Sequence, residues 1–113
     1  MYNKLTKTAE NALSEAVKLA KKMGHTYVGT EHLLLGLLSE KGCIASKILV
    51  SRGIEIDTVS DMIEEAMGFG EVSDVSSKDM SARAKAVISN ASVEAMKYSS
   101  PCVGTEHILL SLM

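Results

Sequence analysis

Two glutamates occupy the same five-residue setting at separate places in the chain. Glu31 lies in the block Val28–His32, and Glu106 lies in the identical block Val103–His107. Each follows Gly-Thr at the start of an expected helix, where exposed N–H groups attract anions. A carboxylate beside such groups suits a ligand that is cationic at one end and anionic at the other. A plain helix start explains the same residues, with Gly permitting the turn, Thr capping and Glu complementing the dipole. The sequence leaves both interpretations open.

Three histidines and two cysteines raise the question of a metal or redox site. His32 and His107 enter leucine-rich segments with no second ligand three or four residues on, so we expect packed, hydrogen-bonded rings. His25 is expected at the surface, near the end of a helix. Cys43 and Cys102 fit no CxxC spacing, and we expect buried free thiols, with a disulfide or a paired metal site as the lesser alternative. No metal site is predicted.

Catalytic motifs are missing from the sequence. It contains no G-x-S-x-G, no H-E-x-x-H and no phosphate-binding G-x-x-x-x-G-K-[ST]. Only the paired glutamates favour a helical enzyme domain, and they stand 75 residues apart in equivalent settings. That arrangement suits two like sites better than one catalytic pair. We therefore expect a binding domain with no catalytic residue and no cofactor of its own.

The setting of the glutamates is part of a longer repeat. Residues 6–38 align with residues 81–113 without a gap, and 13 of the 33 positions are identical. Ordinary composition gives about two or three identities by chance, so the match is a duplication. We assign repeat one to residues 1–68, a linker to residues 69–80 and an incomplete repeat two to residues 81–113, all within a single domain.

Each repeat is predicted to be helical. Thr6 or Thr8 caps a helix that runs to about Met23, and Thr30 begins a second, leucine-rich helix that should be central. A third helix is expected from Ile44 to about Arg52, and a fourth is capped by Asp57 and ends at Gly68. The third helix is expected to bury Ile44, Ile48 and Leu49, and the fourth to bury Val59, Met62, Ile63, Ala66 and Met67.

Repeat two follows the same plan for as far as it extends. Ser81 caps its first helix, and the chain stops at Met113, the position that matches Leu38. Repeat one continues for 30 residues beyond Leu38, so we expect two helices of repeat two to lie outside this chain. The predicted fold class is therefore all-α, with two tandem pseudo-symmetric four-helix repeats, the second truncated after its second helix.

Composition narrows the class of protein. The chain has 113 residues, 46% of them apolar, which suits one domain with a real core. Its net charge of −2 argues against a nucleic-acid partner. No apolar run approaches the roughly 20 residues of a membrane span, and the start lacks the apolar segment of a signal peptide. We expect a cytoplasmic protein. A helix-turn-helix regulator is a poor alternative because the leucine-rich second helix leaves no polar recognition face.

The tandem V-G-T-E-H-[IL]-L-L blocks resemble the N-terminal (Clp-N) domain of ClpC-type AAA+ unfoldases. His25–Leu38 is similar to the family stretch G-H-x-x-[IV]-G-T-E-H-I-L-L-G-L, and Gly42–Leu49 is similar to its G-x-A-x-x-x-L segment. The likeness covers essentially the whole chain. It implies two pseudo-symmetric four-helix halves and a place above the AAA+ ring of the same polypeptide, which works with a protease. The implied partners are adaptor proteins and unfolded or phosphoarginine-marked substrate proteins, and ATP and magnesium would bind to the AAA+ modules.

The resemblance also implies site residues, with one phosphoarginine site in each half. Glu31 and Glu106 would pair with guanidinium groups, and Thr6 and Ser81 would hold phosphates together with helix N–H groups. The family surface for adaptors and cyclic-peptide inhibitors would lie near Tyr2, Met80 and Lys85.

The sequence departs from the family pattern at two helix starts. Repeat two opens Ser81-Ala82-Arg83-Ala84 where the family has Thr-Pro-Arg-Ala, and repeat one has Thr8 where the family has Arg. We therefore expect the first site to be the weaker one if that Arg holds phosphate. A stand-alone Clp-N protein without its own ATPase is the main alternative, since both would share this sequence pattern.

Overall fold

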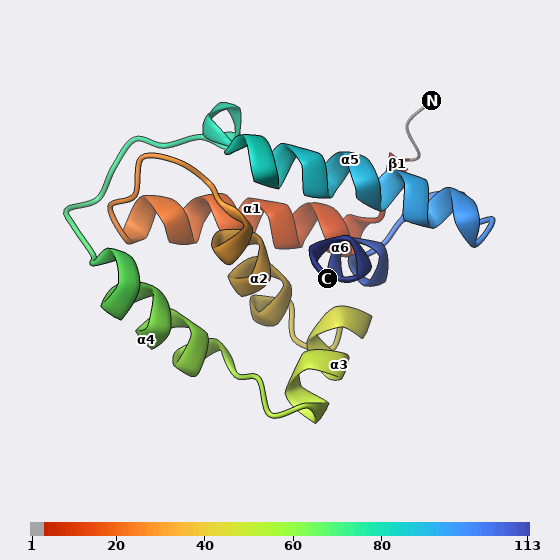
Figure 1. Ribbon diagram of the computed structural model, residues 1–113, viewed down its shortest axis with the longest axis horizontal. Coiled ribbons are helices and arrows are strands. Elements are labelled where there is room, and N and C mark those ends of the chain that lie inside the picture. The colour runs from red at the N-terminus through yellow and green to blue at the C-terminus, as the bar shows by residue number, and fades with distance from the viewer. Residues whose placement is uncertain (1–3) are drawn as a thin grey trace.

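A computed structural model describes residues 4–113. The described chain is mostly helical with almost no sheet, which confirms the predicted all-α class (Figure 1). The helices are α1 (Lys7–Lys22), α2 (Thr30–Ser39), α3 (Ile44–Ser51), α4 (Ile56–Met67), α5 (Ala82–Lys97) and α6 (Thr105–Leu112), with one 3-10 turn, η1 (Ser77–Asp79). Two short strands, β1 (Lys4–Leu5) and β2 (Cys102–Val103), complete the fold. None of these helices is long and apolar enough to cross a membrane.

The two longest helices, α1 and α5, both contribute buried residues to one shared apolar core. Helix α2 packs against α1 and α6 packs against α5, while α2 also contacts α5 and α6, so the two repeats share one interior (Figure 1). Alanines spaced three and four apart line the inner faces of α1 and α5, where small side chains let neighbouring helices approach closely. These buried alanines are Ala9, Ala12, Ala16 and Ala20 on α1, and Ala84, Ala91 and Ala95 on α5.

The contact between α1 and α2 is closer than its counterpart in repeat two. A Cβ atom at Gly36 would overlap the carbonyl oxygen of Ala12 and crowd Ala16. The matching residue of repeat two is Ser111, whose hydroxyl donates to the carbonyl oxygen of Val87 at 2.7 Å. Position 36 therefore needs glycine for close helix packing, and the same position in the other repeat does not.

Two stretches of paired backbone join the repeats, and the sequence analysis predicted neither of them. Strand β1 pairs with β2 in parallel, with Lys4 opposite Cys102 and Leu5 opposite Val103. A matching parallel bridge joins Val28 to Met80. In both places the segment before the first helix of one repeat lies beside the segment before the second helix of the other repeat. Equivalent backbone segments of the two repeats thus pair with each other in two symmetric places.

Helix α4 differs from its prediction at its start and on its inner face. It begins at Ile56 with Glu55 as the N-cap, so Asp57 lies in the first turn and is not the cap. Among the five residues expected to face inward, Ile63 is buried and Val59 is half-buried. The remaining three, Met62, Ala66 and Met67, are exposed.

The reason for this exposure is that α4 packs mainly on a single helix. It packs mainly on α2. Ile63 joins Met23 and Leu35 in a small apolar cluster, and the half-buried Ile56 and Val59 pack against both this cluster and the main core. A helix that touches one neighbour buries a narrow stripe, whereas the apolar stripe of α4 is wider. Helix α4 is therefore held by few apolar contacts.

Helix α3 follows its predicted bounds but not its predicted burial. It spans Ile44–Ser51, and Leu49 is buried as expected. Ile44 and Ile48 are 51% and 44% exposed, so their predicted burial was wrong. The helix contacts α2 and α6 through the stripe that contains Ala45 and Leu49, which turns the other two side chains outward.

The expected truncation of repeat two stays a prediction. On α6, Ile108 and Leu109 are buried against the core, while Leu110 is 41% exposed. The region assigned as a linker contains η1 and the buried Val75, so it packs along the molecule.

Candidate functional site

The first helix of each repeat begins with the same hydroxyl cap. The Oγ1 of Thr6 accepts from the N–H of Ala9, and the Oγ of Ser81 accepts from the N–H of Ala84, both at 3.1 Å. Thr6 is thus the cap in repeat one, and Thr8 lies within the helix. Each cap satisfies one N–H group and leaves the earliest N–H groups of its helix without an intrahelical acceptor.

In the Gly-Thr-Glu-His blocks the cap is provided by histidine, not by threonine. Gly29 and Gly104 are the N-cap residues, and each donates its N–H to the Nδ1 of the histidine three residues on, at 2.9 Å. Both histidines, His32 and His107, are buried, which confirms the expected packed and hydrogen-bonded rings. The threonine of each block is the first residue of its helix, so its predicted role as the cap was wrong.

The two glycines are needed for space. Their φ angles of −101° and −98° are open to any residue, so the predicted need for a special turn was wrong. A Cβ atom at Gly29 would overlap the carboxylate of Glu31, and one at Gly104 would overlap the carboxylate of Glu106. Each glutamate therefore folds back over the start of its own helix.

Glu106 lines a pocket of about 320 Å³ into which three helices direct their N-terminal ends. Helix α1 contributes Thr6 and Thr8, and α6 contributes Thr105 and Glu106. The third helix is α3, whose start supplies Gly42, Cys43 and Ile44. We call this hollow the Glu106 pocket. Its walls combine one carboxylate with several hydroxyl groups and partial positive charge from helix ends.

Hydrogen bonds tie the wall of the Glu106 pocket together. The N–H of Ala45 donates to the Oγ1 of Thr105 at 3.4 Å, which joins α3 to α6. Cys43 is a buried free thiol whose Sγ accepts from the N–H of Ser46 at 3.3 Å, so it acts as the cap of α3. Cys102, also a free thiol, is only half-buried.

Glu31 lines a second pocket, of about 610 Å³, which we call the Glu31 pocket. Arg83 of α5 and Thr30 of α2 line the same pocket as the glutamate, and most of the remaining wall is apolar. Ser81 is not among the lining residues, but its N–H donates to the carbonyl oxygen of Val28 at 2.9 Å, next to the block that contains Glu31. The apolar wall consists of Leu34, Leu49, Val87, Leu109, Leu112 and Met113, with Ser111.

Each pocket is therefore built from both repeats. Thr6 of repeat one meets Glu106 of repeat two, and Arg83 of repeat two meets Glu31 of repeat one. The expectation of one phosphoarginine site in each half stays a prediction. The paired backbone segments bring the first helix of one repeat to the glutamate of the other, so each pocket draws its lining from both halves.

The pockets differ in the groups that accompany their glutamates. Outside the lining of the Glu31 pocket, the hydroxyl of Tyr27 donates to the Oε2 of Glu31 at 3.2 Å. Burial, and then the neighbouring Glu31 carboxylate, raises the pKa of Tyr27 above its ordinary value. The matching residue in repeat two is Cys102, and Arg83 is matched by Thr8. The Glu31 pocket is thus lined by an arginine where the Glu106 pocket is lined by Thr8, and among the described residues only Glu31 has a tyrosine hydroxyl as a hydrogen-bond donor.

Of the three residues expected to form the adaptor surface, Met80 alone is found to line a groove in the described part of the chain. Tyr2 lies outside the described residues. Met80 is half-buried beside a groove of about 440 Å³ between α1 and the linker. Lys85 is exposed on α5 but does not line this groove. The groove is lined by Leu13, Ser14, Val17, Lys18, Lys21, Val75, Ser76, Ser77 and Met80.

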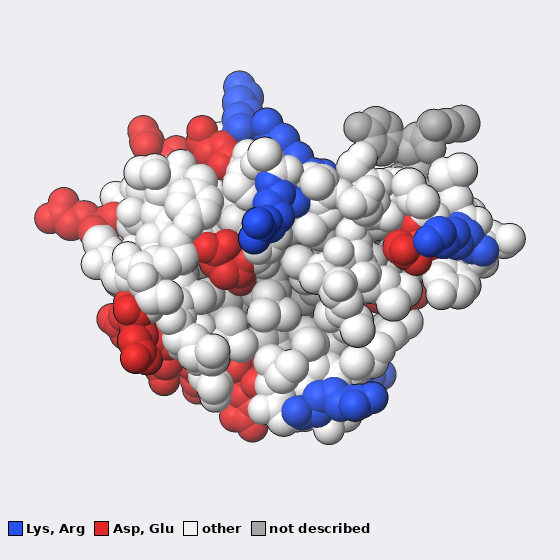
Figure 2. Space-filling view, viewed as in Figure 1, with Lys and Arg blue, Asp and Glu red and all other residues white. Residues whose placement is uncertain are grey.

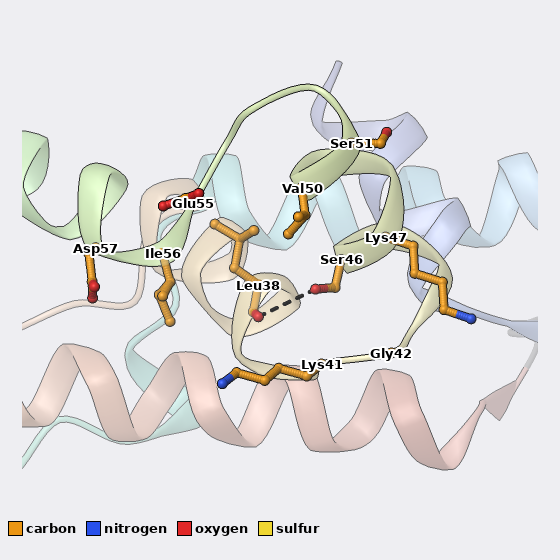
Figure 3. A pocket seen from close by; sticks show the side chains of 10 residues that line it. All are labelled: Leu38, Lys41, Gly42, Ser46, Lys47, Val50, Ser51, Glu55, Ile56 and Asp57. Carbon is orange, nitrogen blue, oxygen red and sulfur yellow. Dashed lines mark hydrogen bonds between the residues drawn. The ribbon is translucent and has the colours of Figure 1, made fainter.

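A further hollow of about 580 Å³ lies between α3 and the start of α4 (Figure 3). Its centre is apolar and its edges carry both signs of charge, without the pairing of glutamate and capping hydroxyl that marks the other two pockets. The lining residues are Leu38, Lys41, Gly42, Ser46, Lys47, Val50, Ser51, Glu55, Ile56 and Asp57. Ser46 is engaged within the fold, since its hydroxyl donates to the carbonyl oxygen of Leu38 at 3.5 Å.

His25 is buried, so its predicted surface position was wrong. One ring nitrogen lies 2.7 Å from the Nε2 of His32 and the other lies 2.8 Å from the carbonyl oxygen of Gly68. Within the described part of the chain, no group of three or more His, Cys, Asp or Glu side chains is placed to hold a metal ion.

Charge is unevenly spread over the surface. On the face seen in Figure 2, acidic side chains gather on the side where α4 and the linker lie, and basic side chains are scattered. This face shows no continuous basic surface of the kind that follows a nucleic-acid backbone.

Comparisons with known proteins agree with this architecture. Residues 4–113 match the family described as the Clp repeat (R) N-terminal domain. The ATP-dependent Clp protease ATP-binding subunit ClpC of Staphylococcus epidermidis is 41% identical over 113 residues, which is all of this chain and 14% of that protein. The chaperone protein ClpB of Oceanobacillus iheyensis is 38% identical over the same length, again 14% of that protein.

Solved structures show the same fold. The N-terminal domain of the chaperone ClpD from Arabidopsis thaliana aligns with a TM-score of 0.79 and 24% identity, covering 99% of this chain and 77% of that one. The N-domain of ClpV from Vibrio cholerae aligns with a TM-score of 0.74 and 21% identity, covering 96% and 65% of the two chains. The family match over nearly the whole chain and the identity to ClpC lead to one conclusion. The chain belongs to the Clp repeat (R) N-terminal domain family.

Proposed function

We propose that this chain is a binding domain that presents substrate and adaptor proteins to an ATP-dependent Clp chaperone or protease ATPase, and that its two glutamate pockets recognise phosphoarginine. The observation that carries the proposal is the Glu106 pocket, where three helix N-termini surround a single carboxylate. The role is one of binding, with ATP and magnesium used by the ATPase modules. Support for the general role comes from the relatives, an ATP-binding subunit of an ATP-dependent Clp protease and a Clp chaperone protein.

The chemistry of the Glu106 pocket matches both ends of phosphoarginine. The planar guanidinium group forms paired hydrogen bonds to a carboxylate, which Glu106 provides. A phosphate is stabilised by unpaired N–H groups and by the dipole at a helix N-terminus, which α1 provides beside Thr6. The hydroxyls of Thr8 and Thr105 line the same pocket and add further donors.

The Glu31 pocket also combines a carboxylate for the guanidinium group with a group for the phosphate, but here the phosphate partner is a charged side chain. Arg83 supplies a full positive charge for the phosphate. One oxygen of Glu31 already accepts from Tyr27, so a guanidinium group must share that carboxylate. Both pockets lie at the seam between the repeats, and we propose that they act as two independent sites for one type of tag.

Calorimetric titration of free phosphoarginine into this chain tests the proposal. Glu106→Gln and Glu31→Gln keep the shape of each side chain and remove its charge, and each is expected to abolish one of two binding events. Unphosphorylated arginine and inorganic phosphate serve as control ligands and should bind at least about tenfold more weakly, because each engages half of a pocket. Phosphoarginine binding that is unchanged in both glutamine variants would show that neither glutamate pocket holds the ligand.

We propose the groove beside Met80 as a docking surface for adaptor proteins. It joins α1 to the linker and combines apolar side chains with Lys18 and Lys21 at its edge, which suits a partner with an apolar anchor beside acidic residues. Substitution of Met80 by Asp should then weaken adaptor binding while phosphoarginine binding stays unchanged. Lys85→Ala is the matched control, because that residue does not line the groove.

A stand-alone accessory protein without an ATPase is the alternative. The chain spans 14% of the length of the ClpC and ClpB relatives, and the ATPase ring and its protease are proposed partners. A coding sequence that continues in frame into a phosphate-binding G-x-x-x-x-G-K-[ST] motif would support the multidomain protein, and a stop codon would support the accessory one.

A further inference from the structure

Two buried histidines of repeat one form a continuous chain of hydrogen bonds between α2 and α4. The N–H of Gly29, at the start of α2, donates to the Nδ1 of His32 at 2.9 Å. The Nε2 of His32 lies 2.7 Å from the Nδ1 of His25. The Nε2 of His25 lies 2.8 Å from the carbonyl oxygen of Gly68, the residue that ends α4.

The position of every proton in this chain follows from its two ends. A backbone N–H can only donate, so the Nδ1 of His32 carries no proton and its neutral ring is protonated on Nε2. That proton points at the Nδ1 of His25, which must accept it. The neutral His25 ring then carries its proton on Nε2 and donates to the carbonyl oxygen of Gly68. With both rings neutral, every donor in the chain faces an acceptor.

One added proton breaks this pattern in either ring. A second proton on His25 would sit on Nδ1 and face the N–H of His32. A second proton on His32 would sit on its Nδ1 and face the N–H of Gly29. No tautomer of the pair removes both conflicts, because the amide of Gly29 cannot accept. Two facing donors in a buried setting cost far more than a lost hydrogen bond between exposed groups.

The surroundings of the His32 ring favour its neutral state. Burial lowers the pKa of His32, while the Glu31 carboxylate acts in the opposite direction and His25 lowers it further. Tyr27 stacks on His25 with ring centroids 6.4 Å apart, and it adds no charge near neutral pH. From the side of α4, the rings meet Gly68 and Phe69, neither of which titrates.

Besides this chain of hydrogen bonds, α4 is held by a narrow apolar contact and by the segment that follows it, where the N–H of Gly70 donates to the carbonyl oxygen of Met23 at 2.8 Å. Ile63 is its buried residue, and its packing is mainly on α2. Near its end, the Sδ of Met67 lies 3.5 Å from the hydroxyl of Tyr27. We infer that His25 and His32 form a proton-sensitive latch, which holds the C-terminal end of α4 against α2 while both rings are neutral and releases it when either ring is protonated.

Repeat two provides a natural comparison. His107 accepts from the N–H of Gly104 at 2.9 Å, as His32 does from Gly29. The position of His25 is occupied by Ser100, whose hydroxyl donates to the carbonyl oxygen of Cys102 at 2.8 Å. The pair of histidines therefore occurs in repeat one and not in the described part of repeat two. Neither histidine lines the Glu106 pocket. The latch is independent of whether phosphoarginine is the ligand.

Nitrogen-15 NMR of the histidine rings in this chain tests the proton positions. At about pH 7.5, His25 and His32 are expected to show the tautomer protonated on Nε2. A ring protonated on Nδ1 at either residue would overturn the inference. This measurement needs no variant and no ligand.

Amide hydrogen exchange, corrected for the intrinsic effect of pH, tests the release. Protection of Met67 and Gly68 is expected to fall about tenfold between about pH 7.5 and about pH 5. Protection of Leu49 in α3 and Ala91 in α5 should hold over the same range, which shows that the domain stays folded. Equal protection of α4 at both pH values would overturn the latch.

Two variants separate the latch from ordinary packing. His25→Ser installs the residue of repeat two, and it should show the low α4 protection at both pH values. Ser73→Ala removes the hydroxyl that donates to the backbone oxygen of His25 at 2.7 Å but leaves both rings in place. Its α4 protection should keep the full pH dependence. A His25→Ser variant as protected as the native chain near pH 7.5 would contradict the inference.

Discussion

The backbone N–H of Thr6 donates to the carbonyl oxygen of Val103, in the other repeat, at 2.9 Å. The equivalent bond, from Ser81 to Val28, has the same length. These two bonds fix the start of the first helix of each repeat beside the glutamate block of the other. A single repeat would carry half of each pocket, so the duplication is what makes the candidate sites possible.

Gly104→Ala is expected to impair the Glu106 pocket without unfolding the chain. The added Cβ overlaps the Glu106 carboxylate, the flexible end of its side chain, which can move aside. The thermal midpoint should therefore shift by only a few degrees, about 1 kcal/mol or less, while phosphoarginine binding weakens about tenfold or more. Calorimetry on the single variant and on the Gly104→Ala, Glu106→Gln pair checks this. The double variant should bind no more weakly than Glu106→Gln alone, and fully additive losses would contradict the proposed cause.

Thr8→Arg is expected to strengthen phosphate recognition in the Glu106 pocket. Thr8 lines that pocket and matches Arg83, which lines the other one. A guanidinium group adds a charge-assisted hydrogen bond to phosphate, so affinity should rise about three- to tenfold and should depend more strongly on salt. The converse change, Arg83→Thr, should weaken only the event that Glu31→Gln removes. Titrations at two salt concentrations measure both effects, and an unchanged Thr8→Arg affinity would count against phosphate binding at that helix start.

Gly36→Ala is expected to destabilise the fold through the contact between α1 and α2. The new Cβ meets the fixed backbone oxygen of Ala12, and overpacking of this kind costs about 1–3 kcal/mol. Ser111→Gly, at the matching place in repeat two, should cost less, about 1 kcal/mol, because it removes one hydrogen bond and lowers helix propensity. Urea unfolding of the two variants gives the comparison. A larger loss in Ser111→Gly would mean that the two helix pairs are not packed as described.

Stability of this chain should decline as the pH falls through the ordinary titration range of histidine. Burial is the main cause that lowers the pKa of His32 below its ordinary value of 6.5, so folding favours its neutral ring. The stabilisation is complete above 6.5 and is lost as the unfolded chain gains protons below it. Urea midpoints between about pH 7.5 and about pH 5.5 measure the slope while most carboxylates stay ionised. His32→Gln should be less stable but should show a shallower slope, and an equal slope would assign the effect to other groups.

Much of the local structure followed from the sequence, because it depends on neighbours along the chain. The hydroxyls of Thr6 and Ser81 mark helix starts since they accept from an N–H three residues on. The leucine-rich segment after Thr30 predicted that α2 is central, and Leu33, Leu35, Leu37 and Leu38 are buried there. The repeated glutamate block identified both candidate sites before any contact was known.

Other features arose from contacts between distant segments, which no local pattern encodes. His25 follows a helix end, where a surface position is the ordinary expectation, yet it is buried against His32 and Gly68. The wide apolar stripe of α4 predicted more burial than a helix with one main neighbour can have.

The sequence by itself determined the helical class and the caps at Thr6 and Ser81, since each depends on residues within a few turns of one another. It also determined the duplication and the two glutamates, since the repeat is visible in the residue pattern alone. Only the tertiary structure decided that Thr6 shares a pocket with Glu106 and that Arg83 shares one with Glu31. The physical reason is the backbone pairing between repeats, which joins Lys4 to Cys102 and Val28 to Met80, positions far apart along the chain. Such pairing uses main-chain groups that every residue carries, so side-chain patterns give no sign of it.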